Sequence, residues 1–456
     1  MRTFYTISLI ITISILSISQ ELPRKAYFGA AVSECEQEGV EVSQIGKESS
    51  AKEMGLQLKD IIVSINGKPV LKPLDLYSVL DAIPAGEKIV LEVIRDFKKK
   101  KLKGKMLGRP LETSENGEVL YDYFDFGEGK IRVLVDQPAS PGPHPSILFI
   151  QGYTCFSMDH LGDHPYGQLV KKLAAKGYVV MRVEKPGEGD NQNTPDCSEI
   201  DFYTEIDAFE GGLKKLKSYD FVDSTKVVIW GHCMGGLIAP IIASTNKVLG
   251  VVVYGATIKT WEEYLVEMFR FQNPYFGVDY VENERIVRHF MDMMYLFYRK
   301  KVSPEELAQN DVYMQIMKNF MNYDGKGHLW TRHYKYLQQI DDFRMIEVWS
   351  KVDAYVLSLF GEYDFEAFSD FEHKTIVDVV NKYHPGKATF KQIDGTTHAF
   401  VKAESIMHGL KNQNYQYMKE NFNDEVVDET DPVFGAWDMD YNDLSNTPTI
   451  PTVSND

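Results

Sequence analysis

Cysteine is scarce in this chain of 456 residues. Its four cysteines, Cys35, Cys155, Cys197 and Cys233, include no Cys-x-x-Cys pair. Cysteine zinc sites and thiol redox motifs usually depend on such closely spaced pairs. The sequence therefore predicts neither kind of site, and we expect no metal ion and no cofactor.

Positive charge is also in short supply. The chain has 49 lysine and arginine residues against 66 aspartate and glutamate residues, and its formal net charge is −17. This balance argues against nucleic acid as a general partner and against an anionic membrane surface. The hydrophobic content of 44% is nevertheless sufficient for a sizeable core. The length fits a globular protein of two or three domains.

Long apolar runs are confined to the first twenty residues, MRTFYTISLIITISILSISQ. Arg2, an Ile/Leu-rich stretch and Ser17-Ile18-Ser19 follow the layout of a secretory signal peptide. An uncleaved anchor is the alternative, but the run is interrupted by polar residues and short for a span of about 20 residues. We expect a signal peptide over 1–19 and an exported protein, periplasmic or secreted, with no membrane span after cleavage. Disulfides persist in such compartments.

Residues 25–107 form a first unit of short strands and helices. Strand patterns cover 26–32, 39–45, 59–70 and 87–96, and helix patterns cover 48–57 and 74–83. This order, with SSAKEMGLQLKDIIVSINGKPV at its centre, resembles a PDZ domain of the type found in exported bacterial proteins.

The PDZ resemblance implies a groove between a strand and a helix, in which a peptide adds as an extra strand. Tyr27, Phe28, Gly29 and Ala30 stand where the family binds a peptide C-terminus through backbone N–H groups. Two alternatives remain open at this point. The groove either captures a peptide partner or is occupied within the protein itself.

Residues 115–420 alternate between strand and helix patterns. Expected strands cover 118–126, 131–137, 146–152, 178–185, 226–231, 248–256, 354–364 and 388–395. The first two suggest an antiparallel pair. The later ones are almost continuously apolar and are separated by amphipathic helices, which is typical of a mostly parallel sheet covered on both faces.

One connection in this domain is too long for a simple crossover. Residues 257–350 contain helix patterns rich in methionine and aromatic residues, and we expect them to form a cap over a functional face. After Glu420 the chain becomes acidic and rich in Pro, Thr, Asn and Ser. We interpret residues 421–456 as a flexible tail.

The most informative stretch is VVIWGHCMGGLIAP, residues 227–240. An apolar strand pattern meets a glycine-flanked turn centred on Cys233, and a helix of small residues follows. A strand–turn–helix of this kind presents a nucleophile at the carboxyl edge of a sheet, with glycines two positions away on each side. Gly231 and Gly235 occupy these two positions.

Two further segments supply the partners that such a nucleophile needs. Asp364 follows a buried strand in SLFGEYD, and His398 follows the last expected strand in QIDGTTHAF. The order nucleophile, acid, histidine is that of the α/β-hydrolases. Residues 115–420 therefore resemble an α/β-hydrolase domain with an eight-stranded, mostly parallel sheet and a helical cap inserted after the sixth strand.

This resemblance implies a role for each catalytic position. Cys233 would attack a carbonyl carbon, His398 would exchange protons with it, and Asp364 would orient His398. The oxyanion would be bound by the backbone N–H groups of Tyr153 and Met234. Gln151 departs from the family's usual histidine before this loop, and RVEKPGEGD at 182–190 is expected to be scaffold.

The fold also implies that the loops carrying Cys155 and Cys197 are neighbours. A disulfide between them at the rim of the site is plausible in an oxidising compartment, but connectivity does not follow from sequence. Cys35 would then be a lone thiol.

Three hypotheses compete for Cys233. It is the nucleophile of an active cysteine hydrolase, as in dienelactone hydrolases; or it marks a catalytically dead shell beside a peptide-binding PDZ unit; or it passes an acyl group to an amine or alcohol. We favour the first, because the acid, the histidine and both elbow glycines occur together. The expected substrate is a small carboxylic ester or thioester. A peptidase-like amide hydrolase, similar to capped aminopeptidases of this fold, is the alternative.

Overall fold

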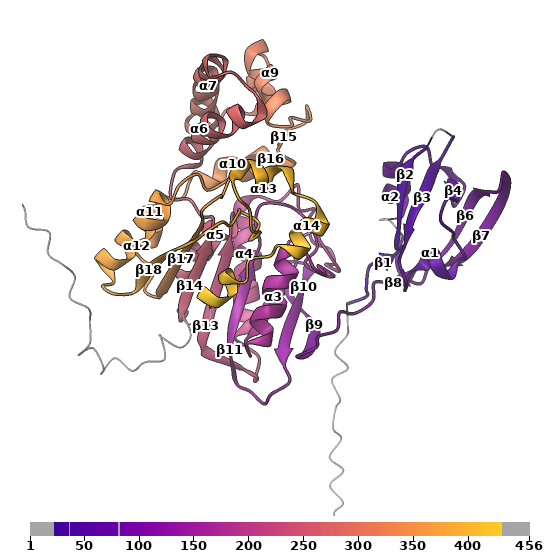
Figure 1. Cartoon of the computed structure of the whole chain (residues 1–456), viewed down its shortest axis with the longest axis horizontal. Helices are drawn as coiled ribbons and strands as arrows, with labels where there is room; N and C mark the ends of the chain where they lie inside the picture. Colours follow the sequence, from indigo (N-terminus) through magenta and orange to yellow (C-terminus); the bar gives the residue numbers. More distant parts are fainter. Residues whose placement is uncertain (1–21, 36, 81–82, 431–456) are drawn as a thin grey trace, which may run out of the picture.

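The structure is a computed structural model that describes residues 22–35, 37–80 and 83–430. The expected signal peptide, residues 1–19, and residues 431–456 of the expected tail lie outside these ranges. Within them, no helix combines the length and the apolar character that crossing a membrane requires. Figure 1 shows an N-terminal unit and a larger domain built around a second sheet.

The N-terminal unit is a sheet with strand order β2-β3-β4-β6-β7, and β5 also pairs with β4. Its core holds Val40, Ile62, Leu76 and Leu91, all fully buried. The short strands β1 and β8 pair with each other where the chain enters and leaves. The elements are β1 (Ala26–Tyr27), β2 (Ala30–Glu34), β3 (Val40–Ile45), α1 (Ser50–Glu53), β4 (Ile61–Ile65), β5 (Lys68–Pro69), α2 (Pro73–Leu80), β6 (Lys88–Arg95), β7 (Lys98–Lys105) and β8 (Leu107–Gly108).

The larger domain contains the expected eight-stranded sheet, with strand order β18-β17-β14-β13-β11-β12-β10-β9. β9 and β12 pair antiparallel with β10, and the other neighbours are parallel. The opening antiparallel pair and the mostly parallel remainder are thus confirmed. The strands are β9 (Gly117–Phe126), β10 (Gly129–Pro138), β11 (His144–Ile150), β12 (Val179–Val183), β13 (Val222–His232), β14 (Gly250–Tyr254), β17 (Tyr355–Gly361) and β18 (Ala388–Ile393).

Both faces of this sheet are buried, which explains the unbroken apolar strands. Along β13, Ile229 belongs to one core cluster and Trp230 to the other, because successive side chains point to opposite faces. Helices α4, α5 and α12 pack on the first face, and α3 packs on the second. Their bounds are α3 (Pro165–Ala175), α4 (Phe202–Leu216), α5 (Gly235–Ala243) and α12 (Phe371–Tyr383).

The long connection between β14 and β17 is helical, and Figure 1 shows α6, α7 and α9 grouped above the sheet. Its buried methionines and aromatic residues, Phe269, Phe290 and Met293 among them, belong to the same core cluster as the first face of the sheet. The elements are α6 (Trp261–Gln272), η1 (Asn273–Phe276), α7 (Tyr280–Met294), η2 (Tyr295–Arg299), α8 (Pro304–Leu307), α9 (Asp311–Phe320), β15 (His328–Leu329), β16 (Arg332–His333), α10 (Tyr334–Ile340) and α11 (Met345–Trp349).

The C-terminal segment differs from the expectation of a flexible tail that begins at residue 421. After α13 (Ile406–Lys411) and α14 (Tyr415–Glu420), Phe422 and Val426 are buried in the second core cluster. Thr430 is buried as well, and its hydroxyl accepts a hydrogen bond from Trp230 Nε1 at 3.2 Å. Residues 421–430 therefore contribute to the core on the second face of the sheet.

Candidate active site

Cys233 stands on a strained turn at the carboxyl end of β13. Its φ is +55°, a conformation that residues other than glycine rarely adopt. The turn depends on close backbone approach: a Cβ on Gly231 would lie 2.2 Å from Gly235 O, and a Cβ on Gly235 would lie 2.2 Å from Ile150 O. Cys233 is a free, partly buried thiol at the point where α5 begins. The sequence pattern thus forms the sharp turn that it predicts.

Asp364 and His398 meet at the same edge of the sheet. His398 Nδ1 lies 2.9 and 2.8 Å from the two carboxylate oxygens of Asp364, which is buried. The backbone N–H groups of Glu366 and Ala367 also donate to this carboxylate, each at 2.8 Å. A Cβ on Gly255 would lie 2.6 Å from His398 Cε1, so only glycine leaves room for the ring there.

The thiol and the imidazole lie close together, with a third group between them. Glu366 Oε2 is 3.4 Å from His398 Nε2 and 3.9 Å from Cys233 Sγ, and the donor atoms of the three residues are within 4.8 Å of one another. Glu366 was not among the predicted residues, although it follows Asp364 by two positions. A thiolate, a carboxylate and an imidazole are also donors of the kind that zinc binds.

The charge state of His398 follows from these neighbours. Burial by itself lowers the pKa of His398, but the carboxylates of Asp364 and Glu366 and the sulfur of Cys233 raise it well above its ordinary value. These neighbours therefore favour the protonated, imidazolium form of His398. Its buried Nε2 makes no hydrogen bond within the described part of the chain, so this nitrogen can meet a reacting group.

The loop after β11 approaches Cys233 from the other side. A Cβ on Gly152 would lie 3.2 Å from Cys233 Cβ and 3.6 Å from its Sγ. The N–H of Gly152 donates to the hydroxyl of Tyr166 at 3.1 Å. The N–H groups of Tyr153 and Met234 have no acceptor among the described residues, so both can bind an oxyanion.

Three buried charges support this loop from below, and sequence reasoning missed them. Lys185 Nζ donates to Gly152 O at 2.6 Å and to Tyr153 O at 3.2 Å, and Arg332 donates to Tyr153 O at 3.2 Å. Both cations pair with Glu205, and all three side chains are fully buried. Burial lowers the pKa of Lys185 to about 8, against the opposing effect of Glu205. The sequence held one indication of this cluster: Lys185 lies within residues 182–190, which we expected to be scaffold.

A disulfide ties the two loops that flank this cluster. Cys155 and Cys197, the pair considered from sequence, are bonded in the structure, with their Cα atoms 5.9 Å apart. Arg332 also donates to Cys197 O. Cys35 remains a free thiol in the N-terminal unit. The disulfide therefore joins the oxyanion loop to the loop that follows Lys185.

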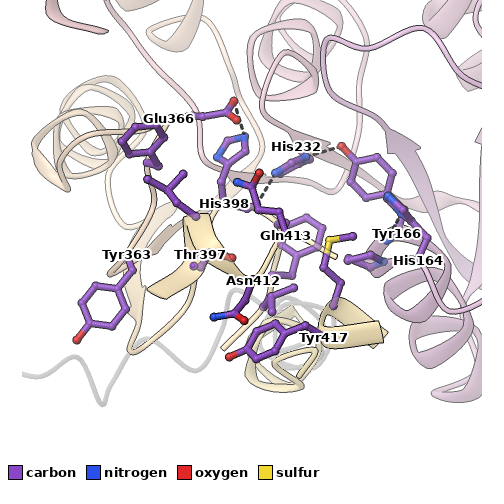
Figure 2. A pocket seen from close by; sticks show the side chains of 18 of the residues that line it. His164, Tyr166, His232, Tyr363, Glu366, Thr397, His398, Asn412, Gln413 and Tyr417 are labelled. Carbon is purple, nitrogen blue, oxygen red and sulfur yellow. Dashed lines mark hydrogen bonds and ion pairs between the residues drawn. The ribbon is translucent and has the colours of Figure 1, made fainter. Parts of the chain in front are cut away.

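A chain of hydrogen bonds connects the elbow to both neighbouring loops (Figure 2). His232 Nε2 lies 2.8 Å from His398 O, and because a carbonyl only accepts, Nε2 carries the proton. Burial lowers the pKa of His232 well below its ordinary value, so the ring is neutral and its Nδ1 accepts the Tyr166 hydroxyl at 2.6 Å. Tyr166 then accepts the N–H of Gly152. This relay was also missed, because its members are far apart in sequence.

Two cavities adjoin the reacting atoms. The smaller, of about 20 Å³, is lined by Cys233, Leu237, Trp261 and Tyr264, among others. The larger, of about 210 Å³, lies on the His398 side and is walled by Phe365, Phe400 and residues of α13 and α14; Figure 2 shows Glu366 beside it. The small cavity has room for about one water-sized group.

Comparisons with known proteins agree with this architecture. Residues 131–277 match the model of the Dienelactone hydrolase family, and residues 41–95 match the model of a PDZ domain. Together with the eight-stranded sheet, these matches establish an α/β-hydrolase fold preceded by a PDZ domain.

Individual relatives cover only parts of the chain. Esterase EstD of Thermotoga maritima is 24% identical over 182 residues, which is 40% of this chain and 41% of that protein. A probable periplasmic serine endoprotease DegP-like from Ectopseudomonas mendocina is 38% identical over 77 residues, which is 17% of this chain. The chain spans only 16% of the length of that DegP-like relative.

Solved structures with some similarity include two enzymes. Est1E from Butyrivibrio proteoclasticus has 15% identity and a TM-score of 0.41, covering 66% of this chain and 96% of that one. A soluble variant of monoglyceride lipase from Saccharomyces cerevisiae has 14% identity and a TM-score of 0.43, covering 72% and 97%.

Proposed function

The chain joins a PDZ domain to an α/β-hydrolase domain similar to the dienelactone hydrolase family, and we propose that it is an exported cysteine hydrolase. It cleaves a carboxylic ester or thioester through a covalent acyl-enzyme on Cys233. The observation that carries the proposal is the convergence at one sheet edge of a strained, free thiol, the His398–Asp364 pair and two N–H groups that have no acceptor among the described residues. An ordinary structural cysteine needs none of these neighbours.

The first half-reaction forms the acyl-enzyme. His398 takes the proton of Cys233 as Sγ attacks the carbonyl carbon, so an S–C bond forms and the carbonyl electron pair moves to oxygen. The N–H groups of Tyr153 and Met234 stabilise that oxyanion. When the C=O bond re-forms, the bond to the leaving oxygen or sulfur breaks, and the leaving atom takes the proton from His398 Nε2.

The second half-reaction releases the acid. A water molecule gives a proton to His398 Nε2 and attacks the thioester carbon, the C–S bond breaks, and the sulfur of Cys233 leaves with its electron pair. Asp364 holds the ring in the tautomer that both steps require. The small cavity beside Cys233 favours a short acyl group, of about acetyl size.

The PDZ unit is proposed to bind peptides. Strand β2 is an edge strand of its sheet, which leaves one side open for an added strand beside α2. Leu74 and Tyr77 of α2 expose apolar surface, and the N–H groups of Phe28 and Gly29 have no acceptor among the described residues. The proposed carboxylate-binding loop is therefore Tyr27 to Ala30.

Action outside the cytoplasm is supported by two observations. The disulfide between Cys155 and Cys197 is of the kind that persists in oxidising compartments. In addition, the relatives that match the PDZ unit are described as probable periplasmic proteins.

The test is intact-mass spectrometry of the protein after mixing with a panel of short acyl esters, acyl thioesters and aminoacyl amides. We expect an adduct on Cys233 with esters and thioesters that is absent in Cys233→Ala and greatly reduced in His398→Ala. Cys35→Ala is the matched control, since it removes the other free thiol. Labelling of Cys35 alone, or of neither thiol, would refute the proposal. Adducts from amides only would favour the peptidase-like alternative.

A further inference from the structure

The described residues that line the cavities around the reacting atoms include no lysine and no arginine. Three cavities meet at Glu366: the two already described and a third, of about 370 Å³, between α6 and the segments at Phe365 and Leu410. Among the described residues that line them, the acidic side chains are Glu366 and Glu372. A substrate carboxylate would therefore meet these two carboxylates, and the cationic group that it would face among the described lining residues, His398, is already paired with Asp364 and Glu366.

Glu366 is the acidic group available to a ligand. Glu372 is buried and already paired with Lys259 at 2.7 Å, and it also accepts from Thr257 and from Ile258 N. Glu366 instead exposes half of its side chain, and within the described residues its only cationic neighbour is His398. Because Asp364 also pairs with that imidazolium, Glu366 is left with negative charge to offer.

Aromatic rings line the same space. Tyr264 lines both the small cavity and the third one, and its ring stacks on Phe368 with ring centres 5.4 Å apart. Phe365 and the exposed Phe276 continue this surface. Burial, with help from nearby acidic groups that include Glu366, raises the pKa of Tyr264 well above its ordinary value, so its ring carries no charge. Neutral aromatic faces beside a carboxylate attract organic cations.

We propose that this site selects substrates whose leaving group carries a positive charge, such as a substituted ammonium, and that Glu366 is the specificity-determining residue. This inference rests on the proposed function and narrows it to a substrate class. Glu366 acts on the leaving group and not on the acyl group, because the leaving group must take its proton from His398 Nε2. That nitrogen lies 3.4 Å from Glu366 Oε2. The size of the acyl group is limited by the small cavity on the Cys233 side.

The experiment compares three acetate esters that differ in the charge of the leaving group. They are acetylcholine, its neutral isostere 3,3-dimethylbutyl acetate, and the acetate ester of 3-hydroxypropanoate; acid release is followed in a pH-stat. We expect kcat/KM for acetylcholine to exceed that for the isostere by about tenfold, as a carboxylate and aromatic rings allow, and the anionic ester to be slowest.

Variants assign the effect to Glu366. In Glu366→Gln the acetylcholine-to-isostere ratio should fall to about one, and because the ratio is taken within one variant, a general loss of activity cancels. Glu404→Gln is the matched control: it removes the same charge from an exposed residue that lines none of the three cavities, so the ratio should stay at the wild-type value. If the acetylcholine-to-isostere ratio fell equally in both variants, the preference would come from the overall negative charge of the protein and not from Glu366. That result would overturn the inference.

A binding measurement separates this inference from the proposed function. Choline should slow alkylation of Cys233 by iodoacetamide, whereas 3,3-dimethylbutan-1-ol at the same concentration should not. If the esters are hydrolysed without preference for the cation, the inference fails and the proposed function stands. If no ester is hydrolysed, the proposed function fails, and the alkylation experiment decides the inference. Slower alkylation with choline than with 3,3-dimethylbutan-1-ol supports the inference, and equal rates of alkylation refute it.

Discussion

Lys185 lies directly behind the oxyanion loop, and its buried Nζ donates to Gly152 O at 2.6 Å. The same nitrogen pairs with Glu205, which also holds Arg332. Two cations and one carboxylate thus leave one net positive charge under the peptide that carries the N–H of Tyr153. This charge orients the peptide and favours negative charge developing on its far side.

Replacing Lys185 by methionine should lower kcat by about 10²-fold while changing KM little, because the lost interaction acts on the oxyanion. The Glu205–Arg332 pair remains balanced in this variant. Glu205→Gln leaves two buried cations without their carboxylate and should cost about 3–5 kcal/mol of unfolding free energy. Steady-state kinetics and urea denaturation measure the two effects. A Lys185→Met enzyme with normal kcat would show that the loop needs no charge beneath it.

Gly255→Ala should displace His398, because the added Cβ would lie 2.6 Å from Cε1 and 2.7 Å from Nδ1. The expected loss of kcat is at least about 10²-fold, the scale of a misplaced catalytic group. Gly386→Ala is the matched control: its φ of +79° imposes similar backbone strain, but nothing lies within 4 Å of the new Cβ. Both variants should lose about 1 kcal/mol of stability from strain. Equal activity of the two would contradict the proposed role of His398.

Removing the disulfide should loosen the oxyanion loop and destabilise the fold. Closing a loop of 42 residues stabilises a protein by roughly 4 kcal/mol in the chain-entropy model. We therefore expect the double variant Cys155→Ser/Cys197→Ser to unfold at lower urea concentration and to have a reduced kcat. A mild reductant should lower the kcat and the resistance to urea of the wild-type enzyme, but should leave both unchanged in the double variant. If reductant affected both equally, its action would lie elsewhere, for example on Cys233.

The raised pKa of His398 makes stability depend on pH. Burial opposes the protonated ring, but Asp364 and Glu366 more than compensate, so the folded pKa is higher than the unfolded one. The resulting stabilisation is complete below the unfolded value of about 6.5 and is lost as pH rises through the folded pKa. Glu366→Gln removes part of it. The difference in unfolding free energy between wild type and Glu366→Gln should therefore be largest near pH 6 and shrink toward alkaline pH; a constant difference would argue against the pairing.

Much of the fold followed from local patterns. The eight strands, the antiparallel opening pair, the helical insertion and the PDZ order were all visible as apolar periodicity and turn residues. The boundary of the C-terminal tail was wrong by at least ten residues, because Phe422 and Val426 are isolated apolar residues in an acidic segment. Whether Phe422 and Val426 become buried depends on the apolar surface of the folded sheet, which the local sequence does not reveal.

By itself, the sequence determined the elements and the types of reacting group: a glycine-flanked Cys233, and Asp364 and His398 each placed after a strand. Strand order and the carboxyl edge of a parallel sheet follow from such patterns because they reflect backbone geometry. Only the tertiary structure decided what surrounds those groups. Glu366 between thiol and imidazole and Lys185 beneath the loop depend on side-chain directions from separate segments. Contacts of this kind have no periodicity and no spacing along the chain, since they form only when the segments pack.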